Sequence, residues 1–212
     1  MAANIEGKQT GAPAEEPDSS SAQQGRFLRE FIRKPASTGA IVPSSVELAR
    51  LMAEEASLEG ASVIVEFGPG TGPITRALID SKPKNAKLIA VERNEEFVAM
   101  LRERHPDLDV AHDCVQELHN ILAARGETAA DRIVSGLPWA AFDESLQRDI
   151  MKAAHDSLTA DGVFVTFAYL QGFALPPAWR FRRLLREMFS EVRQSDVVWR
   201  NVPPAFVYTC RK

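Results

Sequence analysis

The sequence predicts an α/β fold, in which helices cover both faces of a doubly wound, mostly parallel sheet of seven strands with an antiparallel pair at one edge. Three observations favour this fold. Short β-branched or aromatic runs alternate with amphipathic segments from residue 61 onwards, which is typical of parallel strands joined by helices. A glycine-rich turn follows the first of these runs. The last two runs are joined by a short segment that contains Pro203 and Pro204, which suits antiparallel neighbours.

The composition is that of one globular domain. With 212 residues, of which 45% are hydrophobic and 25% charged, the chain is long and apolar enough to form a core. Its two cysteines, Cys114 and Cys210, are too few and too distant for a disulfide-framed scaffold. The longest apolar run, 163–170, is far shorter than a membrane span, and no secretory signal opens the sequence. We therefore expect a cytoplasmic protein.

The N-terminal region divides into a tail and two helices. Residues 1–25 are mostly small and polar, so we expect a disordered tail followed by one domain over 26–212. The segment 26–35 predicts a short amphipathic helix with apolar residues on one side and basic residues on the others, and Pro35 ends it. A second helix is predicted from residue 46 to about 57, with Ser44 or Ser45 as its N-cap.

The remaining elements alternate along the chain. Runs rich in Val, Ile and Phe predict strands at 63–65, 87–91, 108–111, 132–134 and 163–168, and a closing pair at 191–199 and 205–210. Apolar residues at helical spacing predict helices at 73–80, 95–104, 115–124, 144–158 and 181–189. In such a sheet the carboxyl ends of the parallel strands meet at one edge, where ligands bind.

Three successive strand ends carry residues suited to a nucleoside. Gly68, Gly70 and Gly72 permit a sharp turn and a close approach of a ligand to the backbone. Glu92 ends the next strand, 22 residues after Gly70, where a carboxylate accepts hydrogen bonds from both ribose hydroxyls. Asp113 follows the third strand, where it suits the amino group of adenine. The alternatives are a helix-start charge for Glu92 and an N-cap for Asp113.

The pattern E-F-G-P-G-T-G, then V-E-R-N, then H-D-C resembles the class I S-adenosylmethionine-dependent methyltransferases over about residues 36–212. The resemblance implies a Rossmann-like methyltransferase sheet with S-adenosylmethionine as cofactor and S-adenosylhomocysteine as product. It implies that the three glycines lie along the methionine part of the cofactor. It also implies that Glu66 holds the ammonium of the cofactor directly or through water, and that Glu92 holds the ribose. The cofactor-binding residues expected in this way are Thr38, Gly39, Glu66, Gly68, Gly70, Thr71, Gly72, Glu92, Arg93, Asp113, Cys114 and Ser135. The four histidines lack ligand spacing, so we expect no metal.

The fourth strand leads into Ser135-Gly136-Leu137-Pro138-Trp139, which indicates the methyl acceptor site. This step resembles the Asn-Leu-Pro-Tyr of ribosomal RNA adenine dimethyltransferases, with Gly136 where that Asn stands. An aromatic face there stabilises positive charge on an amine. The alternative is a buried loop closed by the proline and the tryptophan. The substrate residues expected are Gly136, Leu137, Pro138, Trp139 and Tyr169.

Four segments resemble the bacterial phospholipid N-methyltransferases, which methylate phosphatidylethanolamine at the inner membrane surface. They are F-L-R-E-F-I-R-K-P from Phe27, T-G-A-I-V-P-S from Thr38, the S-G-L-P step and N-V-P-P-A from Asn201. A basic amphipathic helix suits an anionic lipid surface, so we expect peripheral membrane contact through Phe27, Arg29, Phe31, Arg33 and Lys34. Residues 179–186 form a second such element. The alternative is that both helices only pack on the sheet.

Charge is distributed unevenly along the chain. Residues 51–178 carry a net charge of −9, whereas 26–50 carry +3 and 179–212 carry +5. An acidic centre with basic flanks does not favour general nucleic-acid binding, but the flanks suit an anionic surface. Together with the Gly turn, Glu92 and Asp113, the resemblance makes a phospholipid N-methyltransferase the leading prediction. An RNA adenine N-methyltransferase ranks lower, and a non-catalytic domain that keeps the cofactor fold is the third alternative.

Overall fold

A computed structural model of the chain describes residues 45–173 and 175–212. The predicted tail 1–25, the predicted helix 26–35 with its membrane residues, and Thr38 and Gly39 lie outside the described residues. The strands are β1 (Val63–Phe67), β2 (Lys87–Glu92), β3 (Asp109–His112), β4 (Ala130–Ser135), β5 (Leu158–Tyr169), β6 (Glu191–Gln194) and β7 (Ala205–Arg211). The helices are α2 (Val46–Glu55), α3 (Pro73–Ser81), α4 (Glu95–Arg104), α5 (Leu118–Ala123), α6 (Glu144–Asp156) and α7 (Pro176–Met188).

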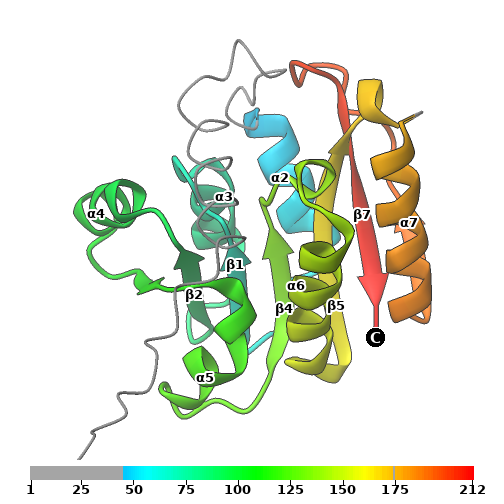
Figure 1. Cartoon of the computed structure of the whole chain (residues 1–212). Coiled ribbons are helices and arrows are strands. Elements are labelled where there is room, and N and C mark those ends of the chain that lie inside the picture. The colour runs from blue at the N-terminus through cyan, green and yellow to red at the C-terminus, as the bar shows by residue number, and fades with distance from the viewer. Residues whose placement is uncertain (1–44, 174) are drawn as a thin grey trace, which may run out of the picture. The chain divides into compact units, whose positions relative to one another are not determined.

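The strands form one seven-stranded sheet in the order β3-β2-β1-β4-β5-β7-β6 (Figure 1). β1 to β5 are parallel, and β7 runs antiparallel to both β5 and β6. The prediction of a mostly parallel sheet with an antiparallel pair at one edge is confirmed. Chain order reverses between β1 and β4, which places the switch point of the topology between the Gly turn after β1 and the loop after β4.

Two apolar layers hold the helices against the sheet. α5, α6 and α7 pack on one face, around Phe67, Phe164 and Phe206. α2 and α3 pack on the other, around Ile64, Val165 and Val207, and α4 covers the same face beside β2 and β3. Alternate residues of each central strand therefore belong to opposite layers, so both faces of these strands are buried.

The expectation that residues 179–186 turn an apolar stripe to a lipid surface is wrong. The apolar stripe of α7, Phe181, Leu184 and Leu185, is buried in the layer with α6, so the helix packs on the sheet and does not turn this stripe to a lipid surface. The helix also begins at Pro176 rather than near residue 181, because a proline at the first turn lacks only an N–H that would have no partner there. Among the described residues no helix is long and apolar enough to cross a bilayer.

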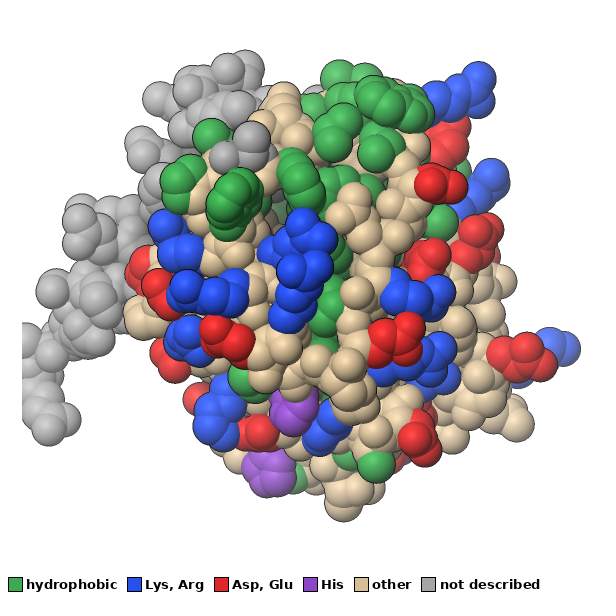
Figure 2. Space-filling view, turned by 90° about the vertical axis from the view of Figure 1, so that its right-hand side faces the viewer, with side chains coloured by type: hydrophobic (Ala, Val, Ile, Leu, Met, Phe, Trp, Pro, Cys, Tyr) green, Lys and Arg blue, Asp and Glu red, His purple; other side chains and the backbone are tan. Residues whose placement is uncertain are grey.

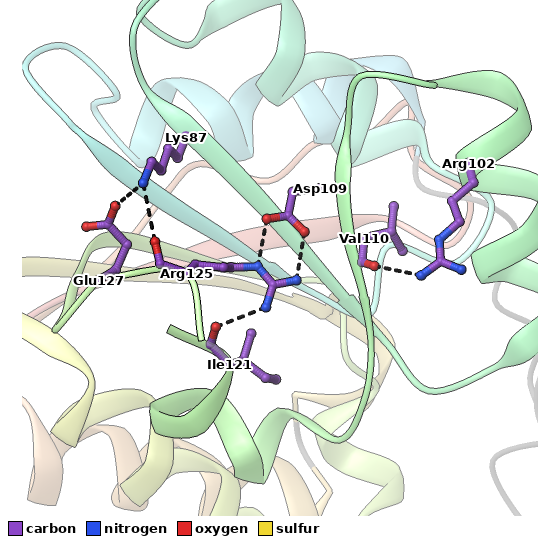
Figure 3. Close-up of polar contacts among 7 residues, drawn as sticks. All are labelled: Lys87, Arg102, Asp109, Val110, Ile121, Arg125 and Glu127. Atoms are coloured by element: carbon purple, nitrogen blue, oxygen red, sulfur yellow. Dashed lines mark hydrogen bonds and ion pairs between the residues drawn. The ribbon is translucent and has the colours of Figure 1, made fainter. Parts of the chain in front are cut away.

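Ion pairs fix the edge of the sheet at β3. Arg125, just after α5, donates from Nε and Nη2 to the two carboxylate oxygens of Asp109 at 2.6 and 2.7 Å, and from Nη1 to the carbonyl of Ile121 at 2.9 Å (Figure 3). Lys87 pairs with Glu127 beside it. These contacts tie the segment after α5 to the starts of β2 and β3.

Candidate functional site

The Gly turn is left-handed at all three of its glycines. Gly68, Gly70 and Gly72 have φ of +64°, +54° and +89°, a region that residues with a Cβ rarely adopt. A Cβ on Gly68 would also lie 2.7 Å from Cδ2 of Leu137, so the turn and the loop after β4 pack directly against each other. At Gly70 a Cβ would meet nothing within 4 Å. The turn is therefore closed on one side and open at Gly70.

Glu66 is a carboxylate buried inside the domain. The side chain is fully buried on the α2 and α3 side of the sheet, and neither of its oxygens accepts a hydrogen bond from a described residue. Burial raises the pKa of Glu66 to about 8. The neighbouring Thr75 lowers this pKa, and the negative charge of Glu92 raises it. The Thr75 hydroxyl is also buried and has no hydrogen-bond partner in the described part of the chain. A site for a cationic group is the arrangement that would satisfy both.

Glu92 joins the Gly turn to the end of β2. Its Oε2 accepts the Gly70 N–H at 3.1 Å and its Oε1 accepts the Asn94 N–H at 2.8 Å. Burial raises the pKa of Glu92, and these backbone donors work against that rise. Each carboxylate oxygen has a second lone pair, so Glu92 still has the capacity to accept two hydroxyl groups.

The end of β3 lies beside Glu92, because the Asp113 N–H donates to the Glu92 carbonyl at 3.2 Å. Asp113 is exposed, and its Oδ1 accepts the Cys114 N–H at 2.7 Å. The Cys114 thiol donates to Gln116 at 3.2 Å. Arg93 is exposed after β2. The structure therefore brings together the three strand ends that the sequence singled out.

The loop after β4 lies against the Gly turn. The Gly136 N–H donates to the Phe67 carbonyl at 2.8 Å, and a Cβ at Gly136 would lie 2.9 Å from the Gly68 carbonyl oxygen. Since that neighbour is backbone, only glycine fits without a shift of the chain. No described residue donates a hydrogen bond to the carbonyl of Gly136. Leu137 and Pro138 are half-buried.

Trp139 is part of the core. It is 3% exposed, stacks on Phe181 with centroids 4.8 Å apart, and donates from Nε1 to the Ser135 hydroxyl at 3.1 Å. Ser135 also accepts the Leu137 N–H at 3.3 Å. The Gln147 side chain of α6 donates to the Trp139 carbonyl at 2.6 Å. Phe181 therefore covers the indole face that we expected to contact the amine of the methyl acceptor.

Tyr169 ends β5 on the same side of the sheet as Glu66. Its ring makes an edge contact with Phe167 at 5.4 Å, and its hydroxyl is buried without a hydrogen-bond partner among the described residues. Burial raises the pKa of Tyr169 to about 12, so the hydroxyl stays protonated at neutral pH. It can therefore both donate and accept a hydrogen bond.

Sequence reasoning missed two residues that support the site. Arg104 donates from Nη1 to the carbonyl of Thr71 at 2.7 Å, which ties α4 to the exposed end of the Gly turn. The buried Asn201 accepts the Ser45 N–H at 2.8 Å and donates to the Pro203 carbonyl at 2.6 Å, which fixes the start of α2 beside the β6–β7 loop. The N-V-P-P-A motif carried the signal for Asn201, whereas nothing in the sequence marked Arg104.

These features fit S-adenosylmethionine on structural grounds. The orphaned carboxylate of Glu66 suits the cofactor's ammonium, the open space over Gly70 admits its methionine part, and Glu92 suits its ribose. Among the described residues no group of three His, Cys, Asp or Glu side chains is placed to hold a metal ion.

Comparison with known proteins supplies the family. No protein-family model matches the chain. The chain is 35% identical over 188 residues to the ornithine lipid N-methyltransferase of Singulisphaera acidiphila, with 87% of this chain and 94% of that protein covered. It is 34% identical over 121 residues to the ribosomal RNA small subunit methyltransferase A of Afipia carboxidovorans, but this match covers 53% of this chain and 42% of that protein.

Solved structures share the fold. An O-methyltransferase from Bacillus cereus, in complex with S-adenosylhomocysteine, superposes with a TM-score of 0.63 at 12% identity, with 92% of each chain covered. At this identity the likeness shows the Rossmann-like methyltransferase fold, while the long match to the S. acidiphila protein shows the family and the cofactor. The chain therefore belongs to the class I S-adenosylmethionine-dependent methyltransferases, in the same family as the ornithine lipid N-methyltransferase of Singulisphaera acidiphila.

Proposed function

We propose that the protein methylates the primary amine of a membrane lipid of the phosphatidylethanolamine type, at the surface of a membrane on its cytoplasmic side. The observation that supports a lipid amine as acceptor is the match over nearly the full length of a relative whose name describes N-methylation of a lipid. The phosphatidylethanolamine type is proposed from the segments that resemble phospholipid N-methyltransferases. The name of the relative also favours the amine of ornithine lipid as a second candidate acceptor. Both lipids present an amine on a flexible headgroup.

The proposal assigns the cofactor to the edge formed by the ends of β1, β2 and β3. Glu66 pairs with the ammonium of the cofactor, Glu92 accepts the ribose hydroxyls, and Asp113 meets the adenine. The other residues proposed to line the cofactor are Thr38, Gly39, Gly68, Gly70, Thr71, Gly72, Arg93, Cys114 and Ser135. When bound, S-adenosylmethionine supplies a methyl group on a sulfonium, which is already activated for transfer to a nucleophile.

The protein's own task is to hold an amine with its lone pair available. An alkyl amine resembles the Lys side chain, whose usual pKa is about 10.4, so it is mostly protonated in neutral water. A site closed by half-buried apolar residues, Leu137 and Pro138, favours the uncharged amine through desolvation. The carbonyl of Gly136 and the hydroxyl of Tyr169 are proposed to accept its N–H groups, which leaves the lone pair to point at the cofactor.

An RNA acceptor fits the site less well. The adenine dimethyltransferases resembled here carry Asn where this chain has Gly136, and a Cβ at that position would lie 2.9 Å from the Gly68 carbonyl oxygen. The side-chain amide that would hold a planar base amine is therefore missing, and the local packing leaves no room for one. A backbone carbonyl suits an alkyl amine, which needs no planar recognition.

The test is methyl transfer from labelled S-adenosylmethionine to four acceptors. They are vesicles of phosphatidylethanolamine, vesicles with ornithine lipid, vesicles of phosphatidylcholine and ribosomal RNA. We expect label in phosphatidylethanolamine or in ornithine lipid. Phosphatidylcholine is the matched control, because its nitrogen already carries three methyl groups and has no lone pair. Label in RNA alone would overturn the proposal.

A further inference from the structure

Large apolar side chains are exposed at one end of the domain. Within the described residues five such side chains are between 56% and 70% exposed, and they belong to three segments. These are the start of α2, the start of α7 and the loop between β6 and β7. The five residues are Val46, Leu175, Trp179, Trp199 and Val202. We call them the apolar rim.

Hydrogen bonds bring the three segments together. The Leu170 N–H, just after β5, donates to the Pro204 carbonyl at 2.8 Å, which joins the segment leading to α7 with the β6–β7 loop. Ser45 is bound to Asn201 of the same loop, which places the start of α2 there. Since β7 begins opposite Tyr169, the last residue of β5, the apolar rim lies at the carboxyl edge of the sheet, the edge that also carries the methyl-transfer site.

Trp179 is held in its exposed position. Its Nε1–H donates to the Phe173 carbonyl at 3.0 Å, although 68% of the residue is exposed. The Phe173 ring in turn lies under the guanidinium of Arg182, 5.5 Å from its centroid. An anchored indole with its polar atom satisfied presents mainly apolar surface, and such rings favour the boundary between headgroups and acyl chains.

Arginines lie next to the apolar rim. Figure 2 shows hydrophobic side chains gathered at the top of this face on both sides of a hollow, with Lys and Arg side chains below them. Two arginines are the chain neighbours of the rim tryptophans: Arg180 follows Trp179 and Arg200 follows Trp199. Arg180 makes no ion pair with a described residue, and the side chain of Arg200 is 85% exposed, with Glu47 at 3.9 Å. These cations have capacity for anionic headgroups.

We propose that the apolar rim docks on one partner, the surface of an anionic lipid bilayer, with its tryptophans among the headgroups and acyl chains and with Arg180 and Arg200 at the phosphates. This inference rests on the proposed function, since it names the partner of the same site. Charge complementarity favours a bilayer over a second copy of the chain, because a second copy would bring its own Arg180 and Arg200 against these two arginines. Docking in this way turns the acceptor site toward the lipid headgroups.

The tryptophans provide the first test. The chain has three, of which Trp139 is buried and Trp179 and Trp199 belong to the apolar rim. The full-length protein is mixed with vesicles of phosphatidylglycerol and phosphatidylcholine that carry bromine on the acyl chains, a quencher of indole fluorescence. We expect blue-shifted emission and quenching in the wild type and in Trp179→Phe and Trp199→Phe, each of which retains one rim tryptophan. The double variant, which retains only Trp139, is the control and should show neither change. Equal quenching of the double variant and the wild type, or no quenching of any protein, would overturn the proposal.

The introduction of negative charge into the apolar rim provides the second test. Trp199→Asp combined with Val202→Asp should weaken binding to the same vesicles at least tenfold, measured by co-sedimentation. Thr128→Asp is the matched control, because it places an acidic residue on the exposed loop before β4, at the opposite edge of the sheet. Thermal unfolding checks that both variants are folded. Unchanged vesicle binding by the double aspartate variant would contradict the inference. The inference would also be wrong if the wild type were a dimer, the double aspartate variant were a monomer, and both bound vesicles equally.

A soluble acceptor separates this inference from the proposed function. A short-chain phosphatidylethanolamine, used below its critical micelle concentration, needs no membrane. If the inference holds, the double aspartate variant methylates this lipid at the wild-type rate and loses activity on vesicles. Failure of the wild type to methylate any lipid amine would refute the proposed function, while the vesicle-binding results would still decide whether the apolar rim docks.

Discussion

The burial of the Glu66 carboxylate predicts a pH dependence of the unfolding free energy, which can be measured without a substrate. The group is fully buried, and its pKa lies near 8 instead of the 4.5 of an exposed glutamate. In the folded, cofactor-free protein it therefore carries a proton at neutral pH, whereas the unfolded chain has released it. Because the folded state binds the additional proton, stability decreases as the pH rises from about 4.5 to about 8 and changes little with this group beyond that range.

The magnitude follows from the two pKa values. One pH unit between them corresponds to about 1.4 kcal/mol, so ionised Glu66 costs about 5 kcal/mol of unfolding free energy above pH 8. Glu66→Gln keeps the shape and removes the titration. Relative to this variant, the wild type should lose about 2 kcal/mol of unfolding free energy between pH 6 and pH 8. The Gln variant should therefore be the more stable protein at pH 8 in the absence of cofactor.

Urea unfolding at pH 6, 7 and 8 measures this difference. Glu96→Gln is the matched control, since Glu96 lies exposed on α4 and the same chemical change there should leave the pH dependence as in the wild type. Saturating S-adenosylhomocysteine should flatten the wild-type dependence, because its ammonium stabilises the ionised carboxylate. Parallel curves for wild type and Glu66→Gln, with and without the ligand, would show that Glu66 neither carries the proton nor holds the ammonium.

Three further predictions concern the neighbouring residues. Glu92→Ala should weaken S-adenosylhomocysteine binding about 10- to 100-fold in calorimetry, because charge-assisted hydrogen bonds are worth roughly 1.5–3 kcal/mol; unchanged affinity would place the ribose elsewhere. Gly136→Ala should lower the unfolding free energy by about 1–3 kcal/mol in urea, since its Cβ meets the Gly68 carbonyl, whereas Gly172→Ala, with nothing within 4 Å, should have little effect; equal effects would contradict the close packing. Tyr169→Phe should lower kcat for lipid methylation while calorimetry finds the same S-adenosylhomocysteine affinity, and an unchanged kcat would remove its hydroxyl from the acceptor site.

The shape of the Gly turn and the place of Glu92 beside it could be predicted from the sequence because their signals are local. Three glycines at alternate positions after a β-branched run fix a strand-to-helix turn, and all three have positive φ in the structure. The spacing to Glu92 then follows from the strand order of a parallel sheet, in which β2 lies beside β1. The antiparallel edge pair was also predictable, since the segment between its strands is too short for a crossover helix.

The surroundings of the acceptor loop could not be predicted in the same way. Whether Trp139 turns toward a ligand or into the core depends on Phe181 and Gln147, which come from helices later in the chain. A composition that reads as amphipathic over 179–186 does not reveal that the sheet already covers its apolar stripe. The exposed Trp199 and Val202 carry no periodic signal, because they lie in a loop.

The packing of Gly136 links the fold to the choice of acceptor. β1 and β4 are paired in register up to Phe67 and Ser135, so the two loops that follow must leave the sheet side by side. Their contact, with the Gly136 N–H bound to the Phe67 carbonyl at 2.8 Å, leaves room for backbone only at this position. A side chain that recognises a planar base would need the loops to separate, which would also displace Gly68. On the proposed function, the chain recognises an amine through backbone and Tyr169, and it obtains selectivity from delivering that amine at a lipid surface.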